Sequence, residues 1–386
     1  MNPKIYYRVL QTDGEVFKKL RNYYDGFVIE ASILEQYTKF TFSLLSTVEK
    51  PFFIDPTHKL VLLTLNEKEW AIKVAEAFKI SECIEEGETI IDKLKENLDA
   101  FVKAAIEYQK NKIKMSSSGL ELFGISGYGM EPEILVAPYL LIDGMHSESF
   151  ELNLEMLRKS IALKGDGKLY AVIALEEYLL SEADDVISEF EIEGVDGFCV
   201  WVSDFREAEE DVKMLEKYVE FFKKLSKLRK PIINLYGGAF SVLLGKLGLI
   251  DCVVQGIAYG EHRNPYISAT GGYQKRYYIP KIHKIVPLYR AQELIDTVPE
   301  LECGCEFCVE ADIIMTPERE IRTDLLKKHY VLSRWKEKQK DFKELYANLK
   351  STIQLLDDVF EGFWDQVRHL KSWEEVLDKI VEDKES

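Results

Sequence analysis

The chain has no long hydrophobic run and no excess of positive charge. None of its apolar stretches approaches the roughly 20 residues that a membrane-spanning helix needs, and its first residues lack the apolar core of a secretory signal peptide. The formal net charge of −17 argues against a protein that coats nucleic acid, because phosphate binding needs a positive surface. These absences predict a soluble, cytoplasmic protein with no membrane partner, in which any nucleic-acid contact is confined to one basic face.

Cysteine is scarce, and a dinucleotide-binding motif is missing. Only six of the 386 residues are cysteine, and three of these lie within six residues, which favours a metal site over a set of disulfides. No Gly-x-Gly-x-x-Gly follows the first predicted strand, so a dinucleotide-binding fold is not favoured. What remains is ordinary globular composition, with 46% hydrophobic and 30% charged residues, in a chain long enough for one large domain and an appendage.

Short apolar, β-branched runs alternate with helical stretches through most of the chain. Continuous apolar runs are typical of parallel strands buried on both faces, and alternation with helices is typical of βα units. Eight such units predict a (β/α)8 barrel of the TIM type, with a doubly wound open sheet as the alternative. The predicted strands are residues 26–30, 52–55, 134–142, 169–174, 197–202, 231–235, 251–254 and 284–288.

Two regions depart from this alternation. Residues 66–112 have a helical pattern and precede a Gly- and Ser-rich stretch that is typical of a loop, so we predict a helical insertion around residues 66–130. From about Thr316 the chain is again helical in pattern. The predicted organisation is a catalytic barrel over residues 1–295, followed by a zinc-binding and helical subdomain over residues 296–386.

The most informative positive feature is the run Cys303-Gly-Cys305-Glu-Phe-Cys308, followed in a predicted helix by His329. Three thiolates and one imidazole form a closed tetrahedral zinc site. Without a metal, three neighbouring thiols would be reactive and easily oxidised. Four protein ligands leave no position for a catalytic water, so the predicted zinc is structural, with His283 as the alternative fourth ligand.

Three acidic residues are predicted at the mouth of the barrel, where the active sites of such barrels are built. Asp55 ends one predicted strand, Asp143 follows the next, and Asp251 belongs to a third. Two carboxylates from different strands can divide the roles of nucleophile and acid–base catalyst if their environments separate their pKa values. The alternatives are a cap or loop carboxylate for Asp251 and a turn residue before proline for Asp55.

Further candidates for substrate binding lie beside these acids. Tyr236, Gly237 and Gly238 follow a predicted strand, and the glycines permit a flat ligand to approach the backbone closely. A simple strand-to-helix turn is the alternative. His58, three residues after Asp55, is a candidate for a substrate-binding or structural group.

One stretch is locally basic and aromatic, against the trend of the whole chain. Lys275, Arg276, Tyr277, Lys281 and Lys284 fall within it. Lysine and arginine can hold phosphates while tyrosine stacks on bases, so these residues are candidates for nucleic-acid contacts. The alternative is an ordinary basic surface loop.

The zinc cluster and the Asp-Cys-Val segment resemble the tRNA-guanine transglycosylase family. Its zinc motif is Cys-x-Cys-x2-Cys followed by a distant His, as in residues 303–329, and its nucleophile is an aspartate in a Phe-Asp-Cys-Val context, which Asp251 resembles. Asp55 occupies the place of the family's second aspartate, although Pro-Thr-His follows it here in place of Ser-Gly-Gly. The resemblance covers about residues 20–350, and only the zinc cluster and the Asp-Cys-Val segment are specific.

The resemblance implies a pentosyltransferase that exchanges guanine in tRNA or DNA for a small 7-deazaguanine-type base, and that often forms homodimers. Asp251 would attack the anomeric carbon to give a covalent aspartyl–sugar intermediate, Asp55 would serve as general acid–base, and the target nucleotide would leave its stack. Residues 174–177 and 198–203 differ from the family's base-pocket segments. The alternatives are a non-catalytic nucleic-acid-binding protein that keeps the scaffold, and an N-glycosidase or nucleoside hydrolase.

Overall fold

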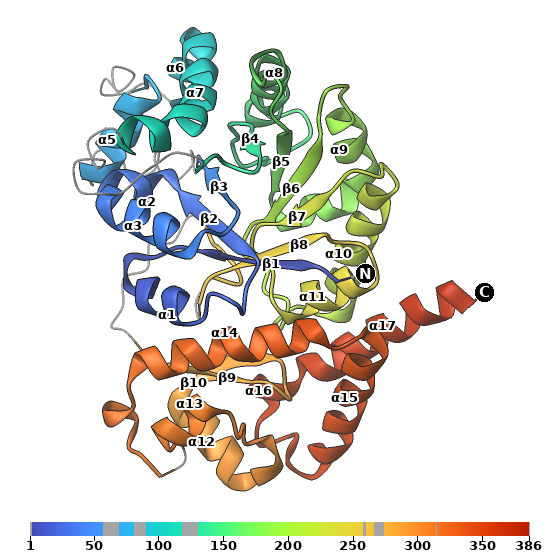
Figure 1. The fold of residues 1–386 in the computed structure, drawn as a ribbon. Helices are drawn as coiled ribbons and strands as arrows, with labels where there is room; N and C mark the ends of the chain where they lie inside the picture. Colours follow the sequence, from blue (N-terminus) through green and yellow to red (C-terminus); the bar gives the residue numbers. More distant parts are fainter. Residues whose placement is uncertain are drawn as a thin grey trace.

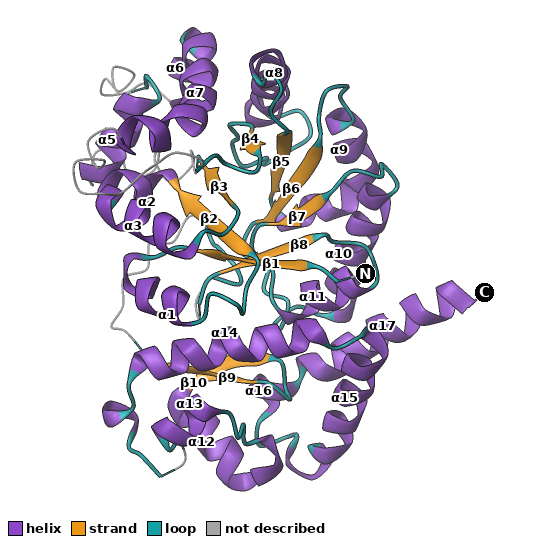
Figure 2. Ribbon diagram, viewed as in Figure 1, coloured by secondary structure: helices purple, strands orange, loops and turns teal. Residues whose placement is uncertain are grey.

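Eight parallel strands form a nearly closed (β/α)8 barrel of the TIM type, which confirms the predicted fold class (Figures 1 and 2). The strands are β1 Lys4–Arg8, β2 Gly26–Glu30, β3 Phe52–Asp55, β4 Leu135–Val136, β5 Leu169–Leu175, β6 Gly197–Val202, β7 Ile232–Asn234 and β8 Cys252–Gln255. Their order in the sheet is β3-β2-β1-β8-β7-β6-β5-β4. The amide of Glu133, just before β4, donates to the carbonyl of Phe52 in β3 (2.8 Å), which brings the two edges of the sheet together.

The computed structural model describes residues 2–56, 69–80, 90–117, 130–257, 260–265, 274–313 and 315–385. Helices follow most strands, and the described part of the segment between β3 and β4 is helical as well. No helix in these ranges is long and apolar enough to cross a membrane. The helices up to β8 are α1 Gly14–Lys19, α2 Ala31–Gln36, α3 Thr38–Val48, α5 Glu69–Ala77, α6 Ile90–Glu96, α7 Leu98–Ser117, α8 Glu148–Leu163, α9 Ala183–Phe190, α10 Val212–Ser226 and α11 Ala239–Lys246.

The barrel interior holds its own apolar cluster, separate from the layer between strands and helices. Along β1, Tyr6 belongs to the interior cluster and Tyr7 to the outer one, as the alternation of side chains in a strand requires. The same alternation turns Arg8 inward at the carboxyl end of β1. Glu30 and Asp55 are paired in register at the carboxyl ends of β2 and β3. The strands therefore deliver three charged side chains to one end of the barrel.

The chain leaves the barrel after β8 and returns to it as a long helix, α14. Arg334 of this helix donates through Nε to Gln255 Oε1 at the end of β8 (3.2 Å), and the ring of Tyr330 lies 6.3 Å from that of Tyr7 in β1. Figure 1 shows α14 between the barrel and the rest of the C-terminal subdomain. The elements of this subdomain are β9 Arg276–Ile279, β10 Lys284–Pro287, α12 Leu288–Thr297, α13 Glu306–Ala311, α14 Thr323–Gln339, α15 Phe342–Leu355, α16 Trp364–Val367 and α17 His369–Glu385.

Two predictions about the strands were wrong. Residues 284–288 were predicted as the eighth barrel strand, but β10 pairs with β9 in a separate antiparallel sheet. The hairpin thus lies outside the barrel sheet although it falls within the predicted range 1–295. The true first strand, Lys4–Arg8, has charged residues at both ends and a single β-branched residue, so it lacks the apolar run that marked the others.

Trp373 in α17 attaches the C-terminal helices to the barrel. Its side chain is 1% exposed, its ring lies 5.3 Å from that of Phe240 in α11, and its Nε1 donates to the carbonyl of Glu207 (2.8 Å). We expect Trp373→Ala to lower the free energy of unfolding by about 3–5 kcal/mol in denaturant titrations. Trp364→Ala, whose side chain is 52% exposed, should cost at most about 1 kcal/mol. Equal losses would contradict the anchoring role of Trp373.

Candidate active site and metal centre

Oppositely charged side chains meet at the carboxyl ends of β1, β2 and β3. Arg8 Nη1 donates both to Asp55 Oδ2 (2.9 Å) and to Glu30 Oε1 (3.1 Å), so one guanidinium nitrogen holds two carboxylates. The guanidinium also lies 4.0 Å from the centre of the Tyr236 ring. Arg8 is 5% exposed and Asp55 is 1% exposed. Buried charges are costly even when they are paired, and at the carboxyl end of a barrel such a cluster indicates a functional site.

A second arginine and two tyrosines complete this barrel-mouth cluster. Tyr139 donates its hydroxyl to Asp55 Oδ1 (2.9 Å). Arg263 Nη1 donates to Glu30 Oε1 (2.7 Å) and to the hydroxyl of Tyr236 (2.9 Å). Glu30 therefore contacts both guanidinium groups, Asp55 contacts that of Arg8, and aromatic rings lie beside them, an environment suited to a flat, polar ligand.

The arginines decide the charge state of the cluster. Burial by itself would raise the pKa of Glu30, but the guanidinium groups of Arg263 and Arg8 outweigh it and lower that pKa. Burial likewise opposes the charge of Arg8, yet the acidic groups of Tyr236, Asp55 and Glu30 raise its pKa above the usual value. Glu30 is therefore ionised at neutral pH.

Sequence reasoning found Asp55 and Tyr236 but missed Arg8, Glu30 and Arg263. Glu30 ends its predicted strand just as Asp55 ends the next, so the same rule would have found it. Arg8 ends the strand that was not predicted. Arg263 follows β8 in a loop without any pattern, and no local signal marks it.

Asp251 lies at the opposite end of the barrel from Asp55, so the prediction that it stands at the barrel mouth was wrong. It directly precedes β8, whose carboxyl end is Gln255. Its carboxylate accepts a hydrogen bond from the amide of Ile232 (2.8 Å), and its carbonyl accepts one from the amide of Lys4 (2.8 Å). Asp251 thus ties together the amino ends of neighbouring parallel strands, which is a structural role.

The other predicted substrate-binding residues have structural contacts. Asp143 is exposed and accepts a hydrogen bond from Ser149 Oγ near the start of α8 (2.7 Å). A Cβ on Gly237 would lie 2.8 Å from Val253 Cγ1, so close packing within the fold already requires glycine there. His58 lies outside the described residues.

A second pair of carboxylates faces Gly238. A Cβ at this glycine would lie 2.8 Å from Glu207 Oε2 and 3.2 Å from Glu261 Oε2, so the two carboxylates point at the same narrow space. Both line a cavity of about 80 Å³ between the barrel mouth and the C-terminal subdomain. Burial raises the pKa of Glu207 to about 7, although hydrogen bonds from Ser241 and the backbone oppose the shift. No local pattern in the sequence marks this pair of carboxylates.

The raised pKa of Glu207 predicts a pH dependence of stability. The folded state binds the proton of Glu207 more tightly than the unfolded state does, so protonation stabilises the fold. This contribution to the free energy of unfolding is fully present below the unfolded pKa of 4.5 and is lost as the pH rises through about 7. We expect Glu207→Gln to reduce the decline in the free energy of unfolding across that window by about 1–3 kcal/mol, measured by denaturant titration. Glu189→Gln, at an exposed position of α9, is the control and should follow the unmodified protein. An undiminished decline in Glu207→Gln would refute the assignment.

Tyr277, which was predicted to stack on bases, is instead buried beside the cysteine cluster, and that prediction was wrong. Its side chain is 1% exposed, its ring stacks on that of His329 at 4.5 Å, and its hydroxyl lies 3.2 Å from Cys308 Sγ. A ring that is buried to this extent cannot stack on a nucleic-acid base.

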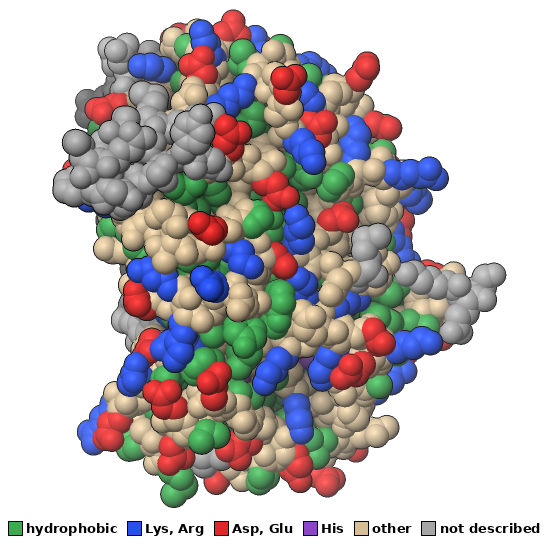
Figure 3. Space-filling view, viewed as in Figure 1, with side chains coloured by type: hydrophobic (Ala, Val, Ile, Leu, Met, Phe, Trp, Pro, Cys, Tyr) green, Lys and Arg blue, Asp and Glu red, His purple; other side chains and the backbone are tan. Residues whose placement is uncertain are grey.

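The predicted phosphate-binding lysines are used largely within the fold. Lys275, Lys281 and Lys284 donate to backbone carbonyls, and burial lowers the pKa of Lys284. Arg276 lines the small cavity next to Gly238. On the face drawn in Figure 3, basic side chains are interspersed with acidic ones and form no continuous stripe. The carbonyl partners are Glu318, Arg319 and Ile321 for Lys275, Glu300 for Lys281, and Ala208 and Asp365 for Lys284.

Cys303, Cys305, Cys308 and His329 come together at one point, as predicted. Their ligand atoms all lie within 4.8 Å of one another. His329 Nδ1 lies 3.4 Å from Cys305 Sγ and 3.2 Å from Cys308 Sγ, while its Nε2 lies 2.7 Å from the carbonyl of Tyr278. A carbonyl partner fixes the hydrogen on Nε2 and leaves Nδ1 to bind a metal. The four residues therefore form a group that can hold a metal ion.

The alternative fourth ligand, His283, is occupied elsewhere. Its Nδ1 lies 3.0 Å from Glu337 Oε1, away from the thiols. The cluster itself joins the loop before α13, helix α13 and helix α14. A metal bound here would cross-link these three elements, and would so add to the stability of the C-terminal subdomain.

No protein-family model matches the sequence, and no curated protein matches it significantly. Among solved structures, xylanase B from Clostridium stercorarium F9 is similar, with 12% identity, coverage of 67% of this chain and 87% of that chain, and a TM-score of 0.34. The intracellular xylanase from Thermoanaerobacterium saccharolyticum JW/SL-YS485 shows 9% identity, coverage of 70% and 90%, and a TM-score of 0.39. At these values the similarity carries no argument about chemistry or substrate.

Proposed function

We propose that the protein is a pentosyltransferase that exchanges a base at an N-glycosidic bond in tRNA or DNA, with its active site at the barrel mouth. The observation that carries the proposal is the pair of carboxylates, Asp55 and Glu30, held by the single guanidinium of Arg8 at the carboxyl ends of adjacent strands. Catalytic groups of such barrels are built at this end. The Cys3His group adds support through the family resemblance, and zinc suits three thiolates and one imidazole.

The proposed mechanism uses two displacements at the anomeric carbon. One carboxylate attacks, the bond from the sugar to the base breaks, and the leaving base takes the bonding electrons and a proton; the incoming base then displaces the carboxylate and gives up its own proton. We assign the attack to Asp55, because Tyr139 and Arg8 fix its two oxygens. Glu30, whose side chain is 15% exposed, is assigned the proton transfers to and from the bases.

The assignment of Glu30 sets a condition on substrate binding. Arg263 and Arg8 lower the pKa of Glu30, so it can accept a proton but is a poor donor in this state. A substrate that displaces Arg263 from the carboxylate removes the guanidinium group that lowers the pKa of Glu30 more. Glu30 could then alternate between acid and base in the two half-reactions.

A non-catalytic nucleic-acid-binding role is the second candidate, and one observation favours it. Both carboxylates of the barrel mouth already form ion pairs with arginine, so the cluster is balanced in charge without a substrate. An N-glycosidase, in which water replaces the incoming base, would use the same two carboxylates.

The test is incubation of the protein with tRNA, duplex DNA or single-stranded DNA, each with labelled guanine or a labelled 7-deazaguanine base. Incorporation of label into one polymer, with a covalent protein–nucleic acid adduct detected by mass spectrometry, is the expected result. Release of base without incorporation would indicate the N-glycosidase. If protein that holds one zinc per chain binds nucleic acid without forming an adduct, releasing base or incorporating label, the function is nucleic-acid binding without catalysis.

A further inference from the structure

A larger cavity, of about 370 Å³, lies in the C-terminal subdomain, away from the carboxylates of the barrel mouth. The turn between β9 and β10 and helices α14 and α15 form its walls. Its volume falls within the range of sites that bind small molecules. Its lining includes the basic residues Lys281, His283, Lys336 and Lys340, the acidic residue Glu337, and Cys303 of the metal centre, together with neutral residues such as Asn348 and Thr352.

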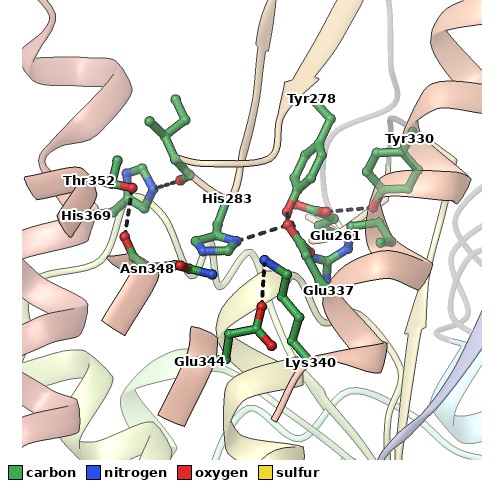
Figure 4. Close-up of polar contacts among 12 residues, drawn as sticks. Glu261, Tyr278, His283, Tyr330, Glu337, Lys340, Glu344, Asn348, Thr352 and His369 are labelled. Atoms are coloured by element: carbon green, nitrogen blue, oxygen red, sulfur yellow. Dashed lines mark hydrogen bonds and ion pairs between the residues drawn. The ribbon is translucent and has the colours of Figure 1, made fainter. Parts of the chain in front are cut away.

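His283 is a buried polar group that faces this cavity. Its side chain is 7% exposed, and its backbone is in the left-handed region (φ 54°), which is unfavourable for a residue other than glycine and often marks a functional position. Its Nδ1 lies 3.0 Å from Glu337 Oε1, whereas its Nε2 has no hydrogen-bond partner in the described part of the chain. Figure 4 shows the ring between Glu337 and Asn348, with the amine of Lys340 beside it.

Glu337 is an acidic residue of the cavity lining, and its carboxylate is shared with two groups outside the cavity. Its other partners are Arg334 Nη1 (2.6 Å) and the hydroxyl of Tyr278 (2.6 Å). Burial opposes its charge, but Arg334 and His283 outweigh burial and lower the pKa of Glu337. An ionised carboxylate accepts hydrogen bonds and does not donate, so it fixes the hydrogen on His283 Nδ1 and turns Nε2 to the cavity; in the imidazolium form Nε2 is a charged donor.

Positive charge gathers around the same cavity, although the whole chain carries −17. Lys281, Lys336 and Lys340 are all in its walls. Lys336 forms no ion pair with any described residue. Lys340 pairs with Glu344 at 3.3 Å, but these side chains are 37% and 54% exposed, so the pair contributes little and a ligand can replace it.

We propose that this cavity binds a phosphate monoester of nucleotide size. The phosphate would lie among His283, Lys336 and Lys340, since lysine and imidazolium are donors that suit phosphate oxygens. Asn348 offers a neutral amide, and Leu345 an apolar surface, to the rest of the ligand. The phosphate can belong to a free nucleotide or to the end of a nucleic-acid strand. This inference does not depend on the reaction proposed at the barrel mouth.

Titration calorimetry on the full-length, zinc-loaded protein tests the proposal, with GMP, guanosine, inorganic phosphate and a short 5′-phosphorylated oligonucleotide as probes. We expect GMP to bind at least about 10-fold more tightly than guanosine, because only GMP carries the phosphate. Lys336→Gln should weaken GMP binding by about 5- to 10-fold through the loss of one charged contact. Lys343→Gln, the same change at an exposed position of α15 outside the cavity, is the matched control and should bind as the unmodified protein does.

Each outcome decides the proposal. If the oligonucleotide binds more tightly than GMP and Lys336→Gln loses this binding, the proposal is supported and the phosphate belongs to the end of a nucleic-acid strand. If GMP binds more tightly, the proposal is supported and the ligand is a free nucleotide. Equal binding of GMP and guanosine, equal losses in the two lysine variants, or no binding of any phosphate probe at millimolar concentration would overturn it. Both lysines are at the surface, so neither variant should prevent folding.

Discussion

Cys308→Ser should abolish metal binding and unfold the C-terminal subdomain. Cys308 Sγ lies 3.4 Å from Cys305 Sγ and 3.2 Å from His329 Nδ1, so the metal would be shared by α13 and α14, two helices joined by a long connection. Apparent binding free energies of structural zinc in small zinc-binding peptides are about 10–16 kcal/mol. Whole domains are stable by only about 5–15 kcal/mol. Loss of one ligand can therefore remove most of the stability of this part of the chain.

Elemental analysis by mass spectrometry and limited proteolysis measure this effect. We expect one zinc per chain in the unmodified protein, none in Cys308→Ser, and early cleavage within residues 274–385 of the variant. Cys199→Ser makes the same chemical change at a buried thiol in the barrel interior, and it should keep its zinc. A Cys308→Ser protein with one tightly bound zinc and unchanged proteolysis would contradict the structural role.

The parts of the molecule that the sequence predicted are those that short-range patterns specify. Three of the metal ligands fall within six residues, so donor chemistry alone indicates their purpose. The barrel strands are buried on both faces, and the sequence displays this burial directly as continuous apolar runs. Asp55 was found because it ends such a run.

Some of the parts that were missed depend on contacts between distant residues. Asp251 is a different case: its sequence context resembles that of a catalytic aspartate and favoured the barrel mouth, although it is the first residue of its predicted strand, and the pairing of Cys252 with Lys4 shows that it lies at the amino end. Arg263 reaches Glu30 across 233 positions of the chain. Pairing of this kind is visible only once the barrel closes.

Asp55→Asn should abolish the covalent adduct and base incorporation, whereas Asp251→Asn should leave both nearly unchanged. The amide cannot act as a nucleophile, so we expect a loss of at least about 10³-fold in the rate of incorporation. Asp251 lies at the amino end of β8 and binds backbone amides, so its replacement should cost only about 1 kcal/mol of stability. Adduct mass spectrometry and label incorporation on the two variants, side by side, give the comparison.

Folding must be separated from chemistry in this comparison, because Asp55 is also the partner of a buried arginine. Removing one member of a buried ion pair typically costs about 3–5 kcal/mol. Asp55→Asn keeps the shape of the side chain and an oxygen that can accept from Tyr139 or Arg8, so it should remain folded at a lower unfolding midpoint. A folded Asp55→Asn protein without adduct, next to an active Asp251→Asn protein, would place the chemistry at the carboxyl end of the barrel. The reverse pattern would place it at the amino end, and would exclude the mechanism built on Asp55 and Glu30.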